Sequence, residues 1–105
     1  MIELTALQLS EYIKKEKNLI LIDVREEWEY KTAAIQNSIH IPISQIQEKM
    51  VKFERDQKIV FICHHGIRSR MVCNFFERMN YKNVINLLGG IDSWSKNVDN
   101  NVPTY

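Results

Sequence analysis

The sequence has few cysteines, no long hydrophobic run and little net charge. Its two cysteines, Cys63 and Cys73, are too few for the disulfide framework of a small secreted domain, so we expect free thiols. Residues 1–5 lack the basic and apolar parts of a secretory signal, and no apolar run approaches the roughly 20 residues of a membrane helix. We therefore expect a soluble cytoplasmic protein with no membrane partner. A formal net charge of +1 also predicts no nucleic-acid partner.

Glycine and proline are scarce as well, and the chain has no internal repeat or low-complexity segment. A chain of 105 residues can bury a core but has no length for a second domain. We predict a single domain over residues 1–105. Its last residues, about 97–105, are polar, and we expect them to form a tail that has no fixed structure or packs loosely.

Apolar runs and turn residues predict alternating strands and helices. The runs at 19–22 and 59–62 are typical of parallel strands covered on both faces. Shorter strands are expected at 2–4, 38–41 and 84–88, each followed by a helix; the helix before the last strand is expected at 69–79. Capping-box spacing marks two helix starts, Thr5 with Gln8 and Ser44 with Gln47. The alternation predicts an α/β fold with right-handed crossovers.

A loop that contains a cysteine and an arginine separates the run at 59–62 from the expected helix. It reads Cys63-His64-His65-Gly66-Ile67-Arg68-Ser69. Unpaired amides at a helix N-terminus, with Arg68 nearby, favour the ionised and nucleophilic form of the Cys63 thiol. Gly66 lets the chain turn tightly. The loop is therefore predicted to be an anion cradle with a nucleophile at its centre.

Two further segments directly follow expected strands. Asp23-Val24-Arg25 follows the run at 19–22, and Gly89-Gly90 follows the last strand. In an open α/β sheet, ligands bind outside the carboxyl ends of the strands. We therefore expect these segments and the cysteine loop to lie on one rim and to form a single site.

Four blocks of the sequence together resemble the rhodanese homology domain in its single-domain sulfurtransferase form. They are Leu21 to Tyr30, Ile35 with Ile41-Pro42, Cys63 to Ser69, and Leu88-Gly89-Gly90-Ile91 with Trp94. The resemblance implies a three-layer α/β/α fold around a central, mostly parallel sheet of about five strands. Two departures stand out: Ala33-Ala34-Ile35 where members usually show Gly-His-Ile, and Asn37-Ser38 where they show Gly-Ala. Asn37 can adopt the left-handed conformation that glycine would supply.

The resemblance implies thiosulfate sulfurtransferase activity. Cys63 would take the sulfane sulfur from thiosulfate or a persulfide donor, become a persulfide, and pass the sulfur to a thiophilic acceptor. Cyanide, a thiol such as glutathione, thioredoxin and a sulfur-carrier protein are the acceptors to be considered. Neither a cofactor nor a metal is expected, because the intermediate is a covalent persulfide. The site residues beside Cys63 are the loop residues that bind the sulfur and the anion: His64, His65, Gly66, Ile67, Arg68 and Ser69.

The roles of several charged side chains stay open at this point. Arg68 completes the loop electrostatically, because a guanidinium does not lose its proton in proteins. Arg25 either draws in anionic donors or supports the loop through Asp23 or Glu26. His64 and His65 either tune the thiolate or contact the acceptor, or else they are solvated loop residues. Cys73 lies within the expected helix beside apolar side chains, which favours packing over a redox role.

Three alternative functions share some of these features. A cysteine phosphatase or an arsenate reductase also places a thiolate in an amide cradle, but the phosphatase pattern has five residues between cysteine and arginine, whereas Cys63 and Arg68 have four between them. A non-catalytic rhodanese-like module for partner binding typically lacks the cysteine. A zinc site built from Cys63, His64 and His65 would need adjacent ligands, which match the usual zinc spacings poorly.

Overall fold

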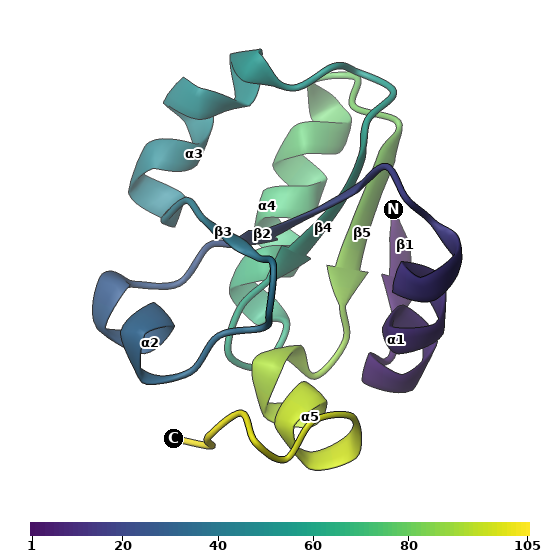
Figure 1. Cartoon of the computed structure of the whole chain (residues 1–105). Helices are drawn as coiled ribbons and strands as arrows, with labels where there is room; N and C mark the ends of the chain where they lie inside the picture. The colour runs from purple at the N-terminus through teal and green to yellow at the C-terminus, as the bar shows by residue number, and fades with distance from the viewer.

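A five-stranded parallel sheet forms the centre of the computed structural model, which describes residues 1–105 (Figure 1). The strands are β1 (Ile2–Leu4), β2 (Leu19–Asp23), β3 (Ile39–His40), β4 (Lys58–Ile62) and β5 (Asn83–Leu87). They lie in the order β1-β5-β4-β2-β3, and every neighbouring pair is parallel. β2 and β4 carry the two continuous apolar runs and lie inside the sheet, as strands covered on both faces should. The predicted α/β class is confirmed.

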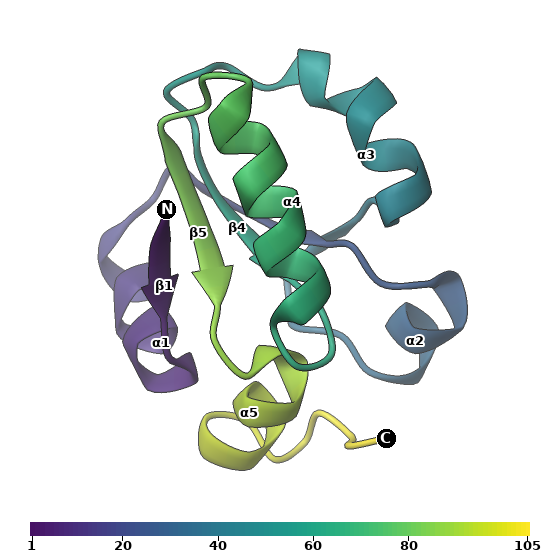
Figure 2. The same cartoon turned by 180° about the vertical axis from the view of Figure 1, so that it is seen from behind.

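Helices cover both faces of the sheet. They are α1 (Ala6–Lys15), α2 (Glu27–Thr32), α3 (Ile43–Lys49), the short 3-10 helix η1 (Met50–Lys52), α4 (Ile67–Arg78) and α5 (Gly90–Asn97). Successive side chains of a strand point to opposite faces, so Ile59 and Phe61 of β4 pack with α3 and α4, whereas Val60 and Ile62 pack with α1 and α5. Figure 2 shows α4 in front of the sheet and α1 on its far side. The three-layer arrangement is confirmed.

The helix starts agree only in part with the capping patterns. The Thr5 and Gln8 capping box forms at the start of α1, with N···O distances of 2.9 and 3.2 Å. The box predicted for Ser44 is wrong, because the N-cap of α3 is Pro42, two residues before Ser44, and the helix begins at Ile43. The Ile43 amide donates to the Val24 carbonyl at 3.2 Å, which starts the helix where the chain leaves the sheet. None of the helices has the length and apolar character that a membrane span requires.

The C-terminal residues after α5 are packed more closely than expected. Val102 is 8% exposed and belongs to the apolar cluster that α1 and α5 form against the sheet. Figure 1 shows the chain continuing from α5 beneath the carboxyl ends of the strands toward α2. The expectation of a loosely packed tail is wrong here, because Val102 is anchored in the core. Asn37 has a φ of 69°, which confirms the left-handed conformation expected of it.

Candidate active site

The cysteine loop follows β4 at the carboxyl edge of the sheet and turns its amides toward the sulfur. Cys63 is 1% exposed. The Gly66 amide donates to Cys63 Sγ at 3.1 Å and the Ser69 amide at 3.4 Å. Gly66 has a φ of 95°, so it adopts the left-handed conformation that glycine accommodates without strain. α4 begins at the next residue, two residues before the predicted start, and the loop therefore ends in the first turn of a helix.

The start of α5 holds the outer side of the loop. The Ile91 amide donates to the Cys63 carbonyl at 2.9 Å, and the Asp92 amide donates to the His64 carbonyl at 3.1 Å. Gly90 packs so closely that a Cβ there would overlap both carbonyl oxygens. Because these carbonyls are turned outward, the loop amides remain free to face the sulfur. The expected placement of the Gly89-Gly90 turn beside the loop is confirmed.

A buried asparagine that the sequence analysis did not single out ties the loop to β5. Asn86 has no exposed surface. Its Nδ2 donates to the Gly66 carbonyl at 3.1 Å, and its Oδ1 accepts from Ser69 Oγ at 2.5 Å. Ser69 Oγ also lies 3.2 Å from Cys63 Sγ. Since the hydroxyl proton of Ser69 is directed to Asn86, its oxygen can accept a hydrogen bond from the Cys63 thiol. The available signal for Asn86 was its position between Ile85 and Leu87, as a polar residue within the apolar part of β5.

The arginine at the end of the loop is paired with a buried glutamate of α2. Arg68 donates from Nη1 and Nη2 to the two carboxylate oxygens of Glu29, at 2.8 and 2.9 Å. Glu29 is 4% exposed, and its carboxylate also accepts from the Glu26 amide and from the Tyr105 hydroxyl, both at 2.9 Å. The Arg68 hydrogen bonds lower the pKa of Glu29 to about 2. The same pair raises the pKa of Arg68. Glu29 thus neutralises the cation of the loop.

Arg25 lies on the same rim but has no exposed surface. Its Nε and Nη2 donate to the Asp23 carboxylate at 2.9 and 2.7 Å, and Nη2 also donates to the Ala33 carbonyl. Nη1 donates to the Tyr105 hydroxyl at 2.7 Å. A solution anion does not reach this guanidinium. The sequence left two roles open for Arg25: drawing in anionic donors, or supporting the loop through Asp23 or Glu26. These contacts favour support through Asp23, and Glu26 does not contact the Arg25 side chain.

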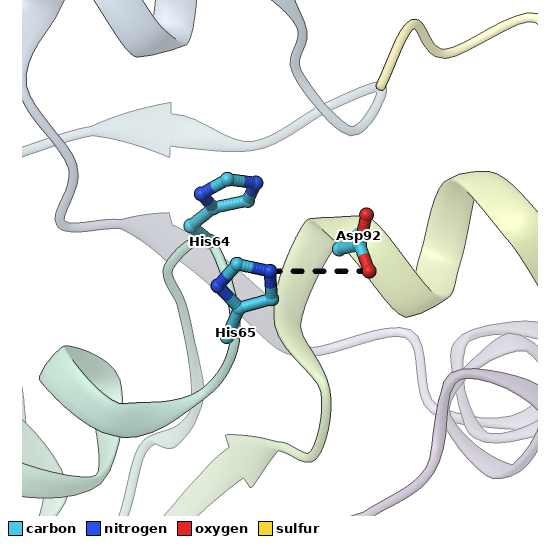
Figure 3. A group of neighbouring side chains, drawn as sticks. All are labelled: His64, His65 and Asp92. Carbon is cyan, nitrogen blue, oxygen red and sulfur yellow. Dashed lines mark ion pairs between the residues drawn. The ribbon is translucent and has the colours of Figure 1, made fainter. Parts of the chain in front are cut away.

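The two loop histidines differ in their surroundings. The His64 ring is stacked between His65, with a centroid distance of 3.9 Å, and Tyr105, at 4.0 Å. Burial lowers the pKa of His64, and the neighbouring His65 lowers it further. His65 is exposed, and its Nε2 lies 3.9 Å from Asp92 Oδ2. Figure 3 shows both histidines on the loop and Asp92 opposite them on α5.

These three residues are also the group whose donor atoms come closest to a metal-binding arrangement. All of the donor atoms lie within 4.8 Å of one another. Asp92 Oδ2 already accepts from Lys96 at 3.0 Å, and the two imidazoles stack face to face. Cys63 does not join the group, because its sulfur lies against the loop amides. The structure therefore does not bring together the zinc ligands Cys63, His64 and His65 that were weighed as an alternative.

The second cysteine is part of the core. Cys73 lies in α4 with no exposed surface and packs in the cluster on the α3 and α4 face of the sheet. Burial raises the pKa of its thiol to about 12, so the thiol stays protonated at neutral pH. The predicted packing role is confirmed.

Comparison with known proteins identifies similar sequences and folds. A family model described as "Rhodanese-like domain" matches residues 5–97. The chain is 38% identical over 92 residues to YtwF of Bacillus subtilis, which is provisionally named a sulfurtransferase; the match covers 88% of each chain. It is 28% identical over 92 residues to the thiosulfate sulfurtransferase GlpE of Coxiella burnetii, covering 88% of this chain and 85% of that protein.

Solved structures of rhodanese-like proteins also resemble this chain. A rhodanese-related protein from Thermoplasma volcanium is 38% identical and superposes with a TM-score of 0.82, covering 93% of this chain and 94% of the other. A rhodanese-like domain protein from Staphylococcus aureus is 25% identical, with a TM-score of 0.83 over 100% of this chain and 99% of the other. Tyr105, which contacts His64, Arg25 and Glu29, lies outside the residues that the family model matches.

Proposed function

Because this chain belongs to the rhodanese-like domain family, we propose that it is a sulfurtransferase that carries a sulfane sulfur as a persulfide on Cys63. The observation that carries the proposal is the convergence of the Gly66 and Ser69 amides on Cys63 Sγ. Backbone donors held in place in this way stabilise negative charge without reorganising during the reaction. The relatives that are named sulfurtransferases support the same kind of activity.

The first step would load the sulfur. The Cys63 thiolate attacks the outer sulfur of thiosulfate, the sulfur–sulfur bond of the donor breaks, and sulfite leaves with the bonding electron pair. A persulfide donor would react in the same way and release its thiolate. The charge on Cys63 then moves to the terminal sulfur. α4 begins at Ile67, and the first amides of a helix have no partner within the helix, so they are the donors proposed to hold that sulfur.

The second step would unload it. A nucleophile such as cyanide, a small thiolate, thioredoxin or a sulfur-carrier protein attacks the terminal sulfur, the Cys63–sulfur bond breaks, and the Cys63 thiolate is regenerated. No cofactor takes part in either step, since the covalent persulfide holds the sulfur between them. Because Glu29 neutralises the charge of Arg68, we assign Arg68 to holding the end of the loop in position.

The spacing of the loop supports sulfur as the group transferred. Four residues separate Cys63 from Arg68, one fewer than in the phosphatase pattern, and the cradle is correspondingly narrower. Cys63 is already in contact with amides and with Ser69 Oγ inside this loop. A single sulfur atom fits such a bowl better than a tetrahedral phosphoryl group.

Steady-state kinetics of thiocyanate formation from thiosulfate and cyanide test the proposal. A persulfide intermediate predicts double-displacement kinetics, so that varying cyanide at several thiosulfate concentrations gives parallel reciprocal plots. Cys63→Ser is expected to be inactive. Cys73→Ser is the matched control, because it changes the other thiol outside the loop, and it should retain activity. Equal activity in wild type and Cys63→Ser, or turnover of an aryl phosphate that depends on Cys63, would contradict the proposal.

A further inference from the structure

Tyr105 connects three parts of the site that are far apart in the sequence. Its ring lies nearly parallel to that of His64, at a centroid distance of 4.0 Å and an interplanar angle of 8°. Its hydroxyl accepts from Arg25 Nη1 at 2.7 Å and donates to Glu29 Oε1 at 2.9 Å. The Trp28 ring of α2 stands nearly perpendicular to the Tyr105 ring, with a centroid distance of 5.7 Å and an interplanar angle of 79°. Tyr105 itself lies outside the four sequence blocks that resemble the family, whereas its four partners lie within two of those blocks.

The Glu29 carboxylate is linked to both ends of the cysteine loop, directly to Arg68 and through Tyr105 to His64. Arg68, at the end of the loop, binds both oxygens of Glu29. His64, directly after Cys63, is stacked on Tyr105, whose hydroxyl is fixed on Glu29 Oε1. Arg25 fixes that hydroxyl from the other side. A movement of Tyr105 would therefore remove the support of the His64 ring, while the Arg68 pair and the α5 hydrogen bonds to the Cys63 and His64 carbonyls stay in place.

We propose that Tyr105 is a positioning residue for the sulfur-transfer site, which holds His64 and so keeps the loop amides directed at Cys63. The proposal rests on the function proposed above and extends it to a residue outside the family match. Aromatic pairs gain stability beyond the area they bury. In this protein the stability gained from the aromatic pair also holds the loop, because the ring stacked on Tyr105 is that of His64, which directly follows Cys63.

The pH dependence of Cys63 alkylation separates positioning from simple stabilisation. The midpoint of the rate profile reports how well the loop supports the thiolate, whereas the plateau at high pH reports access to the sulfur. Cys73 is fully buried and stays protonated, so a single alkylation followed by intact mass reports Cys63. The measurement does not require sulfur transfer. Failure of wild type to form thiocyanate would count against the proposed function and leave the test of Tyr105 unaffected.

The matched control is a second tyrosine stacked on a histidine in the same protein. The Tyr30 and His40 rings are 4.7 Å apart at an interplanar angle of 12°, and the Tyr30 hydroxyl donates to the Ser38 carbonyl at 2.7 Å. Neither ring stacks on the cysteine loop. Tyr30→Leu therefore removes the same kind of interaction, and thermal unfolding measures how much stability each variant loses.

Tyr105→Leu is expected to raise the alkylation midpoint by up to about 1 pH unit, the limit reached if the energy of the aromatic pair is coupled fully to the thiolate. Tyr30→Leu should leave the midpoint at the wild-type value even if it lowers the melting temperature equally. Tyr105→Phe keeps the ring on His64 and should show less than half the shift of Tyr105→Leu. An unchanged midpoint in Tyr105→Leu would overturn the proposal, as would an equal shift in Tyr30→Leu. Should Tyr105→Leu fail to fold, a large midpoint shift in Tyr105→Phe would overturn the role of the stacked ring.

Discussion

Replacing Glu29 by glutamine removes the charge that links the cysteine loop to α2 while keeping the size of the side chain. The four hydrogen bonds to the Glu29 carboxylate hold its pKa at about 2, against an ordinary value of 4.5. At 1.36 kcal/mol per pKa unit, this shift corresponds to about 3 kcal/mol of folding free energy at neutral pH. Breaking a fully buried ion pair on one side typically costs about 3 to 5 kcal/mol, and the Glu29 pair lies at the lower end of that range because Arg68 is 36% exposed. We therefore expect Glu29→Gln to lose about 3 kcal/mol.

The effect should depend on pH in a defined direction. Because the pKa of Glu29 is lower in the folded protein than in the unfolded chain, its stabilisation is fully present above pH 4.5 and is lost as the pH falls toward 2. Urea unfolding of wild type and Glu29→Gln should therefore differ most near neutral pH and converge near pH 2. Glu27→Gln is the control: its carboxylate, in the same helix, forms an exposed pair with Lys31 at 3.1 Å. Such a pair contributes about 0.5 kcal/mol or less.

Two results would refute this reasoning. One is a loss below about 1 kcal/mol in Glu29→Gln at pH 7, the cost of an ordinary neutral hydrogen bond. The other is a difference between wild type and Glu29→Gln that stays constant from neutral pH down to pH 2. Either would mean that the Glu29 charge contributes little to the fold.

Two further substitutions test how the loop is held in place. Gly90→Ala places a Cβ against the Cys63 and His64 carbonyls, so we expect sulfur transfer to fall at least about tenfold, with a lower melting temperature; wild-type rates in a folded variant would show that the α5 contact is dispensable. Asn86→Leu removes the hydrogen bonds to Ser69 and to the Gly66 carbonyl, and it should raise the midpoint of Cys63 alkylation and lower the melting temperature. No change in the alkylation profile would rule out a role for Asn86 in supporting the sulfur.

Local patterns were sufficient to predict the elements that position the loop. The apolar runs of β2 and β4 are continuous in the sequence, and burial on both faces of an inner parallel strand requires that composition. The loop from Cys63 to Ser69 is also continuous, so its nucleophile, its glycine and its arginine could be identified together. The start of α3 could not be predicted, because it depends on the hydrogen bond from the Ile43 amide to the Val24 carbonyl at the sheet edge.

The Gly89-Gly90 turn was expected beside the loop, but three other residues that hold the loop could not be predicted, because they meet it only in the folded chain. Glu29 is 39 positions from Arg68, and Asn86 is 17 positions from Ser69. Tyr105 is 76 positions from Glu29 and lies in a polar segment without a motif. The role of a buried charged or amide side chain, such as Glu29 or Asn86, can be recognised only once its hydrogen-bond partner is known. The partner is not evident until the strands and helices are assembled.

The central claim is that Cys63 carries a transferable sulfur, and intact mass spectrometry tests it most directly. Protein incubated with thiosulfate and freed of excess reagent should gain the mass of one sulfur atom, and cyanide should remove it. Cys63→Ser should gain nothing, whereas Cys73→Ser should load like wild type. Absence of the added mass after treatment with either thiosulfate or a persulfide donor, or its presence in Cys63→Ser, would contradict the account.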